Sequence, residues 1–350
     1  MTLLRRAQKV GRRYLNPVPT AMNGPGLILK LLPRLMFSKE ERVPRYPPGP
    51  FRTDVSVYAT PPKSGLRVTW IGHSSSLVEM DGVRVLIDPV WEQRASPFGW
   101  VGPSRFFAPP LTLQELPRID AVLVSHDHYD HLGAGTVRRL ARLQPEARWV
   151  TSLDVGPILR RFGVRARRIT ELDWTESVAI EGLDGGSCEI TSLPSRHFSG
   201  RSLMSRFTTL WASFVLRGAG DAATGRRGHT IYYGADSGWW DGFAEIGAAY
   251  GPFDLTMLEI GAFNELWRQI HLGPDGAVRA FGALGEAGRE QGLLMPIHWG
   301  LFDLGLHAWR QPMERLLELA GEQRLKLWQP EPGVPSEVVG GVEVRSDWWR

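Results

Sequence analysis

Short apolar runs separated by turn residues begin at residue 66. The stretches LRVTWIG (66–72), SSLVEMDG (75–82) and VRVLIDP (83–89) have the length and composition of strands. They are divided at Gly72 and at Asp81-Gly82, and an Asp-Gly pair between apolar runs favours a tight hairpin turn. The pattern therefore predicts three consecutive strands joined by short turns.

Further along the chain, strand-like runs alternate with helical patterns. AVLVSH (121–126) is typical of a buried strand, and GTVRRLARL (135–143) follows it with helical spacing. Similar runs predict strands at 147–152, 165–170, 177–180, 188–194, 211–217, 229–236, 255–261 and 292–300, and helices at 155–162, 275–284 and 313–320. Strands that first form meanders and later alternate with helices favour an α/β fold of two sheets with helices outside.

The first fifty residues have a different pattern. Helical spacing predicts a short amphipathic helix, with an apolar face of Leu3, Leu4, Ala7, Val10, Tyr14 and Leu15 and a basic face of Arg5, Arg6, Lys9, Arg12 and Arg13. The apolar run at 27–37 is too short to cross a bilayer, and RVPRYPPGPF (42–51) is a proline-rich connector. We therefore expect an arm and connector at 1–50 and one large domain at 51–350.

The arm is much more basic than the rest of the chain. Residues 1–50 contain ten Lys or Arg and two Glu, so the arm carries +8 and the other 300 residues carry −4, which gives the total of +4. A basic amphipathic segment can dock on an anionic membrane surface or in a groove, which is one interpretation of residues 1–41. The other is that the arm packs against its own domain. With the basicity confined to the arm, no nucleic-acid partner is expected.

Composition excludes several classes of protein. With 43% hydrophobic and 22% charged residues among 350, the chain can bury a globular core. The single cysteine, Cys188, excludes an internal disulfide and any multi-cysteine metal site. We see neither a long apolar run nor a signal-peptide pattern. We expect a soluble cytoplasmic protein, associated at most peripherally with the inner face of the membrane.

Candidate chemistry is concentrated in SHDHYDH (125–131), which follows a predicted strand and holds three of the nine histidines. His126 and His128 are two positions apart, so both imidazoles can project to one side of an extended backbone, and Asp130 with His131 follows. One tetrahedral zinc takes about three or four protein ligands, so this loop supplies more candidates than one metal needs. A histidine and aspartate set without cysteine favours zinc, iron or manganese.

Three later strand ends offer the further ligands that a two-metal site would need. His197 follows the run at 188–194, Asp236 ends the run at 229–236, and His298 lies near the end of the run at 292–300. Each is a polar residue after an apolar run, where a core strand delivers a side chain to the rim of a sheet. Their repetition at several strand ends favours one shared site.

HDHYDH resembles the H-x-H-x-D-H signature of the metallo-β-lactamase superfamily, and the later His, Asp and His keep that superfamily's order. Longer segments resemble its N-acylphosphatidylethanolamine-hydrolysing phospholipase D-like branch. They are VTWIGHSSSLVEMDGVRVLIDPVWEQRASPF, VGPSRF, AVLVSHDHYDHL, RHFSGRSLMSRFTTLWASFV, GADSGW, GPFDLTMLEIGAF and IHWGLF. The resemblance spans roughly residues 66–302. It implies an αββα sandwich of two mixed β-sheets face to face with helices outside.

The resemblance also implies a set of metal ligands. One metal would be held by His126, His128 and His197, the other by Asp130, His131 and His298, and Asp236 would bridge both. Two carboxylate oxygens can span two cations, whereas an imidazole has one free nitrogen. The expected cofactor is a pair of divalent ions, with zinc preferred over iron or manganese. A hydroxide held between two such ions would attack a phosphodiester.

Other residues are candidates for supporting roles. The resemblance places His271 toward the substrate, as a proton donor or phosphate contact. His73 and Asp88 are expected beside the ligands, orienting them, and for His73 a hydrogen-bonded core histidine is the alternative. Arg196 and Arg201 flank His197 and could meet a phosphate, and Trp239 could wall a groove for an acyl chain.

Three hypotheses follow from the sequence. The leading one is a phosphodiesterase of phospholipase D type that acts on N-acyl phospholipid-like substrates at or near a membrane. The second is a hydrolase of a small soluble ester or lactone, such as a sugar phosphate lactone, in which the arm packs on the domain or mediates oligomers, so that a homodimer stays open. The third is a metal-binding regulatory protein without catalysis.

Overall fold

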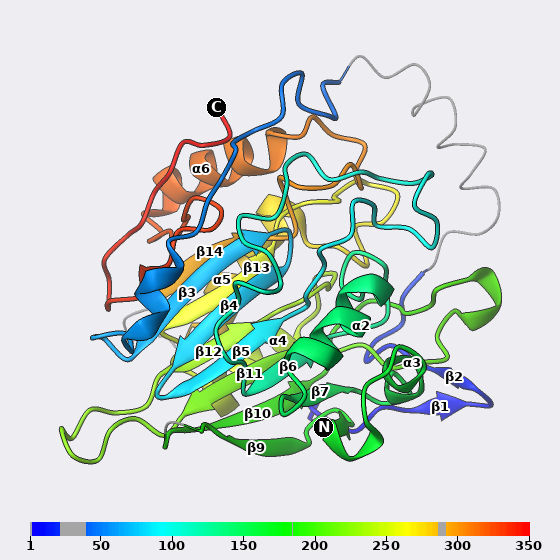
Figure 1. Ribbon diagram of the computed structural model, residues 1–350. Helices are drawn as coiled ribbons and strands as arrows, with labels where there is room; N and C mark the ends of the chain where they lie inside the picture. Colours follow the sequence, from blue (N-terminus) through cyan, green and yellow to red (C-terminus); the bar gives the residue numbers. More distant parts are fainter. Residues whose placement is uncertain (1, 22–39, 184, 286–291) are drawn as a thin grey trace.

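The computed structural model describes residues 2–21, 40–183, 185–285 and 292–350, and within them two β-sheets pack face to face (Figure 1). The first sheet has the strand order β15-β3-β4-β5-β6-β7-β8. Its strands are β3 (Leu66–Gly72), β4 (Ser75–Met80), β5 (Val83–Ile87), β6 (Ala121–Val124), β7 (Arg148–Ser152), β8 (Ile169–Leu172) and β15 (Ser336–Glu337). The second sheet has the order β14-β13-β12-β11-β10-β9. Its strands are β9 (Ser177–Glu181), β10 (Ser187–Leu193), β11 (Ser213–Gly218), β12 (Thr230–Tyr233), β13 (Leu255–Glu259) and β14 (Leu293–Ile297).

Helices cover the outer faces of both sheets (Figure 1). They are α2 (Ala134–Leu143) and α3 (Gly156–Arg161) on the first sheet, and α4 (Gly242–Tyr250), α5 (Gly273–Leu284) and α6 (Gln311–Gln323) on the second. On the second side, α5 packs on β13, and α4 and α6 both contact α5. The predicted αββα sandwich is confirmed.

The side chains of a central strand face two different cores. In β5, Val85 and Ile87 belong to the core between the sheets, whereas Leu86 lies in a separate apolar cluster with Val137 of α2 and Leu159 of α3. Because both of their faces are buried, central strands such as β6 and β14 are continuous apolar runs rather than alternating ones. The length of these runs, with the turn residues between them, therefore predicted the strands.

Two elements of the sandwich were not predicted. Helix α4 contains Gly242 and Gly247, which weaken the helical signal of its sequence. A Cβ at Gly247 would lie 2.5 Å from the carbonyl oxygen of Leu284, so the close approach of α4 to the end of α5 needs a glycine there. Strand β15 has two residues and is defined only by its pairing with β3. The strand predicted at 165–170 begins later, because residues 166–168 form a 3₁₀ turn before β8.

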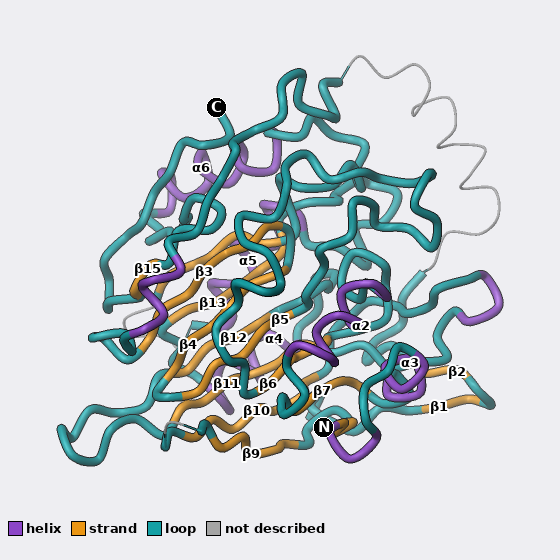
Figure 2. Tube along the Cα trace, viewed as in Figure 1, coloured by secondary structure: helices purple, strands orange, loops and turns teal. Residues whose placement is uncertain are grey.

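The predicted amphipathic helix in the arm is wrong. Residues 9–14 form a hairpin of β1 (Lys9–Val10) and β2 (Arg13–Tyr14), and Figure 2 shows both as strands. Gly11 turns the chain with φ of +60°, and Tyr14 is buried in the core, its hydroxyl donating to Asp154 at 2.6 Å. These tertiary contacts outweigh a weak helical preference.

The described part of the arm packs on the large domain, as the second interpretation expected. The backbone N–H of Leu3 donates to Glu245 at 2.8 Å, and that of Ala7 donates to Asp173 at 2.9 Å. The apolar run at 27–37 lies outside the described residues. Across the residues that are described, no helix is long and apolar enough to span a bilayer.

The Asp81-Gly82 turn links the two sheets. It joins β4 to β5 as predicted, with positive φ at both residues. The Asp81 carboxylate accepts from the backbone N–H of His229 at 2.9 Å and pairs with the Arg226 guanidinium at 2.5 Å, both from the loop between β11 and β12. Burial alone would raise the pKa of Asp81, but His229 and Arg226 lower it to about 2. The turn therefore holds a buried charge that ties one sheet to the other.

Candidate metal centre

Several strands end at one edge of the sandwich, and a candidate residue follows each end. In the first sheet β5 and β6 are parallel, and in the second sheet β12, β13 and β14 are parallel. Strand β3 is antiparallel to β4, which is antiparallel to β5, so β3 runs in the same direction as β5. By the same argument through β11, β10 runs in the same direction as β12. The residues delivered to this edge are His73 after β3, Asp88 after β5, the loop 125–131 after β6, His197 after β10, Asp236 after β12 and His298 after β14. The topology thus gathers side chains that are far apart in the sequence.

One group of four side chains contains His126, His128, His197 and Asp236, whose ligand atoms all lie within 4.8 Å of one another. His126 Nε2 is 2.9 Å from His128 Nδ1, and His197 Nε2 is 3.4 Å from the same atom. We call this group the first cluster. It has the composition predicted for one metal, namely three imidazoles and one carboxylate.

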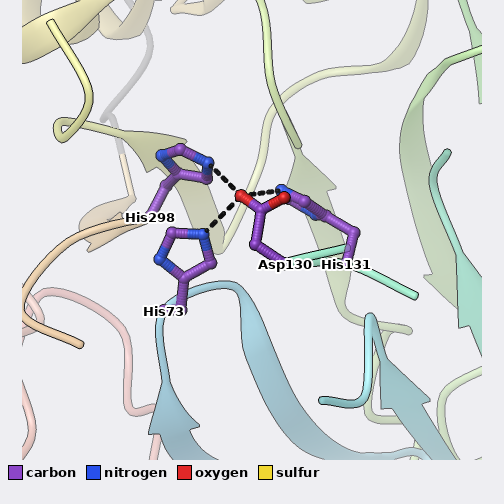
Figure 3. A group of neighbouring side chains, drawn as sticks. All are labelled: His73, Asp130, His131 and His298. Atoms are coloured by element: carbon purple, nitrogen blue, oxygen red, sulfur yellow. Dashed lines mark hydrogen bonds and ion pairs between the residues drawn. The ribbon is translucent and has the colours of Figure 1, made fainter. Parts of the chain in front are cut away.

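A second cluster holds His73, Asp130, His131 and His298, which Figure 3 shows converging from different segments. Asp130 Oδ2 lies 3.0 Å from His73 Nε2, 3.3 Å from His298 Nε2 and 3.5 Å from His131 Nε2. Three of these residues were expected as ligands of one metal. His73 was expected beside the ligands, and the structure brings it as close to Asp130 as the other imidazoles.

Asp236 lies between the two clusters. Its Oδ2 is 3.4 Å from His197 Nε2 of the first cluster and 3.2 Å from His298 Nε2 of the second, while its Oδ1 is 3.2 Å from His131 Nε2. The side chain is buried. This is the position that a bridging carboxylate requires, and the structure brings all seven sequence-predicted ligands together around it.

Protonation states differ between the two clusters. Burial lowers the pKa of His126 and His197 well below its usual range, so both imidazoles are neutral and offer a lone pair. Burial alone would raise the pKa of Asp236, but His131 and His298 hold it well below its usual range. Burial disfavours the charge on His131, yet neighbouring carboxylates, led by Asp236, raise its pKa well above the usual range. Bound divalent cations would replace the positive charge that His131 and His298 place beside Asp236.

Asp88 forms hydrogen bonds to both ends of the loop 125–131. Its Oδ2 lies 2.7 Å from His131 Nδ1, and it also accepts from the Ser125 hydroxyl at 2.5 Å and from the Tyr233 hydroxyl. The Ser125 N–H donates to the other carboxylate oxygen at 2.7 Å. Asp88 thereby fixes the ring of His131 so that Nε2 points toward Asp130 and Asp236. Asp88 lies beside a candidate ligand, which is the position that the sequence predicted for it.

His271 lies next to both clusters and contacts the buried carboxylate of Glu259. One of its ring nitrogens lies within 4.8 Å of ligand atoms of Asp236 and His298. Its Nδ1 is 2.6 Å from Glu259 Oε2, at the end of β13. Glu259 was not predicted as a site residue, and its place within the apolar run 255–261 gave no signal beyond a charge inside a buried strand.

Arg196 is held by protein groups rather than facing open solvent. Its guanidinium donates to the Thr20 hydroxyl at 3.0 Å, the Pro19 carbonyl at 3.0 Å and the Trp239 carbonyl at 2.8 Å. Nearby, the Asn16 side-chain amide donates to the His197 carbonyl at 2.8 Å. The arm thus packs against the segment that carries a candidate ligand, a contact that the sequence analysis missed.

Arg201 and Trp239 also make contacts within the protein. Arg201 Nη1 donates to the carbonyls of Asp127 and Leu132 at 2.7 and 2.8 Å, so it braces both ends of the metal loop. The Trp239 ring stacks on Phe243 with ring centroids 5.6 Å apart. Asp127, which the sequence left without a ligand role, lies in neither cluster.

Comparison with known proteins identifies the family. Residues 83–299 match the beta-lactamase superfamily domain. An N-acyl-phosphatidylethanolamine-hydrolyzing phospholipase D 1 of Caenorhabditis elegans is 36% identical over 264 residues, which cover 73% of this chain and 70% of that protein. The chain belongs to the metallo-β-lactamase superfamily. An uncharacterised protein of Mycobacterium tuberculosis is also similar, at 45% identity over 287 residues, covering 82% of this chain and 72% of its own length.

Solved structures agree with this family at the level of the fold. An isothiocyanate hydrolase from Delia radicum gut bacteria has a TM-score of 0.59 at 19% identity, covering 78% of this chain and all (100%) of its own. Igni18, a metallo hydrolase from Ignicoccus hospitalis, has a TM-score of 0.56 at 20% identity, covering 77% of this chain and 97% of its own. The chain is thus a metallo-β-lactamase-fold, metal-dependent hydrolase with candidate His/Asp metal sites.

The residues present in this superfamily member fit a pair of metal ions. Of the atoms described, His131 Nε2 and Asp236 Oδ1 are buried and face each other at 3.2 Å without a well-directed hydrogen bond, and both belong to the candidate ligand set. A divalent cation between them would take a lone pair from each atom, so their placement is compatible with a metal. Nitrogen and carboxylate oxygen donors without sulfur fit zinc, and also iron or manganese.

Proposed function

We propose that the protein is a dinuclear phosphodiesterase of phospholipase D type that hydrolyses N-acyl phospholipid-like substrates. The observation that carries the proposal is the position of Asp236 between two clusters of metal-binding side chains. Two divalent ions, preferably zinc, would supply Lewis-acid stabilisation of the phosphate and a water activated near neutral pH. The similarity to the nematode phospholipase D favours a phospholipid among the possible esters.

The chain's own residues would position the substrate and move one proton. Because its Nδ1 is hydrogen-bonded to Glu259, His271 keeps Nε2 free for the site. Nε2 can deliver a proton to the oxygen that leaves phosphorus, or hold a phosphate oxygen. The guanidinium groups of Arg196 and Arg201 are bound to protein carbonyls, so we assign them to shaping the site rather than to binding phosphate.

A lipid substrate requires a surface that meets a membrane, and three neighbouring loops suit that task. Leu203 and Met204 are 83% and 91% exposed at the tip of one loop, and Trp100 is 79% exposed on another. The loops are neighbours, because two adjoining cavities connect them. Arg201 lines both cavities, together with Phe98 in one and with Lys9, Gly11 and Arg12 of the β1–β2 hairpin in the other. Exposed apolar tips beside the basic hairpin favour an anionic bilayer as the partner.

A substrate panel tests the proposal. Purified, metal-loaded protein should cleave bis(p-nitrophenyl) phosphate and vesicles that contain an N-acyl phosphatidylethanolamine, and chelation should abolish both activities. A panel of lactones and sugar phosphate lactones serves as the comparison. Turnover of the lactones alone would rule out the phosphodiesterase and favour a hydrolase of small soluble esters.

A further inference from the structure

Glu259 lies behind the metal centre and connects three of the segments that build it. The residue ends β13 and its side chain is fully buried. One carboxylate oxygen, Oε1, accepts from the backbone N–H of Ser237 at 2.7 Å and from that of Leu272 at 3.2 Å. Ser237 follows Asp236, and Leu272 follows His271, so a single carboxylate fixes the backbone on both sides of the site.

The other oxygen of Glu259 faces two imidazoles. Oε2 lies 2.6 Å from His271 Nδ1 and 3.8 Å from His298 Nδ1. With Oε1 taken by two backbone donors, Oε2 is the acceptor available to an N–H of His271. A carboxylate that accepts from Nδ1 determines which ring nitrogen carries the proton and holds the ring in one orientation.

We propose that Glu259 is a positioning residue that accepts a hydrogen bond from Nδ1–H of His271 and thereby directs Nε2 toward the substrate. This inference rests on the proposed function, because it gives His271 the role of proton donor to the leaving oxygen. The oxygen of a water forms a new bond to phosphorus as the bond from phosphorus to the leaving oxygen breaks. The bonding pair goes to the leaving oxygen, which takes a proton from Nε2 of His271. The ring keeps its Nδ1–H on Glu259, and the proton lost by the attacking water returns to Nε2, so that the water is divided between the phosphate and the leaving alcohol.

The Glu259→Gln substitution separates this role from a structural one. A glutamine can still accept from Ser237 and Leu272, but its NH₂ group would face His271 Nδ1, so the ring must place its proton on Nε2 and loses the acceptor that orients it. N-acyl phosphatidylethanolamine releases an alkoxide, which is a poor leaving group without a proton donor. We therefore expect kcat for this substrate to fall by roughly 100-fold, a typical contribution of general acid catalysis to the rate. KM and metal content should stay unchanged.

Leaving-group dependence provides the decisive readout. p-Nitrophenolate leaves without a proton, so kcat for bis(p-nitrophenyl) phosphate should change less than about threefold in the same variant. Glu265→Gln is the matched control, because this glutamate lies on the same β13–α5 connection with its side chain 86% exposed. Equal losses on both substrates, or loss of metal, would overturn the proposal in favour of a structural role.

A measurement without turnover keeps the inference separate from the proposed function. Nitrogen-15 chemical shifts of His271 in the zinc-loaded protein should report the Nδ1–H tautomer in the native chain and the Nε2–H tautomer in Glu259→Gln. The Nε2–H tautomer in both proteins would overturn the proposal. If neither phosphodiester is cleaved by the native protein, the proposed function fails, while the tautomer still decides the role of Glu259.

Discussion

Asp236 is the residue on which both clusters depend, because its two oxygens reach imidazoles of each. We expect Asp236→Ala to reduce bound metal from two ions per chain toward none and to abolish activity. Elemental analysis of the purified variant measures the first effect. Asp241→Ala is the control, since this exposed aspartate makes no side-chain cap of α4. Activity at the native level in Asp236→Ala would contradict the assigned site.

Asp88 acts on the second cluster through His131. Replacing it with Asn removes the charge beside His131 Nδ1 and keeps the size of the side chain. We expect the affinity for one of the two ions to fall by about 10- to 100-fold, with the other bound normally, as is typical for partners that orient a ligand. Titration with a zinc chelator of known affinity should resolve the two ions. Equal weakening of both would indicate a general loss of structure.

The ligands were predictable from the sequence, but Glu259 and Asn16 were not. The candidates His197, Asp236 and His298 each follow an apolar run, which places them at strand ends, whereas the division of the candidate ligands between two metals came from the resemblance to the superfamily. Glu259 lies inside the run 255–261, and only folding brings it to His271. Asn16 lies in the arm, and its contact with His197 depends on a hairpin that helical spacing did not indicate.

At the scale of elements, the β4–β5 turn supports a prediction about stability and pH. Asp81 has a folded pKa of about 2, below the usual value of 3.8, so its charge stabilises the fold at any pH above about 4. We expect Asp81→Asn to lower the free energy of unfolding by about 2 kcal/mol at pH 7, from the difference in pKa. As the pH falls through 4 toward 2, this advantage disappears, and roughly half should remain near pH 3. Urea unfolding at pH 7 and pH 3 tests this, and a pH-independent difference would contradict it.

Strands were easier to predict than the elements that depend on distant contacts. Runs such as 121–124 are apolar on both faces, and the Asp-Gly pair fixes the turn after β4. The spacing of residues 3–15 suits a helix equally well, but Tyr14 gains more from burial beside Asp154 and Phe207 than from helical hydrogen bonds. Local pattern therefore failed where tertiary contacts decide the backbone.

For the whole molecule, we predict that the exposed loop tips carry binding to anionic vesicles. Replacing Trp100, Leu203 and Met204 together with Ser removes the apolar side chains that would enter the interface. Vesicle affinity should fall at least tenfold, since each buried apolar side chain contributes about 1.5–3 kcal/mol. Hydrolysis of bis(p-nitrophenyl) phosphate should be unchanged.

Leu183→Ser is the control for that surface. Leu183 is 63% exposed, but it lies in the turn between β9 and β10, away from the three loops. Vesicle sedimentation of both variants beside the native protein compares the two surfaces. Equal loss of binding in both variants, or none in the triple variant, would contradict the assigned surface.

The hydrogen bond from Asn16 to the His197 carbonyl spans 181 positions of the chain. Because closing so long a loop is entropically costly, we expect this contact to form late in folding. The arm is synthesised early, yet it can support the first cluster only after the second sheet has assembled. Maturation of the metal centre is then a late event, and zinc uptake during refolding should lag behind the change in tryptophan fluorescence that reports burial of the core.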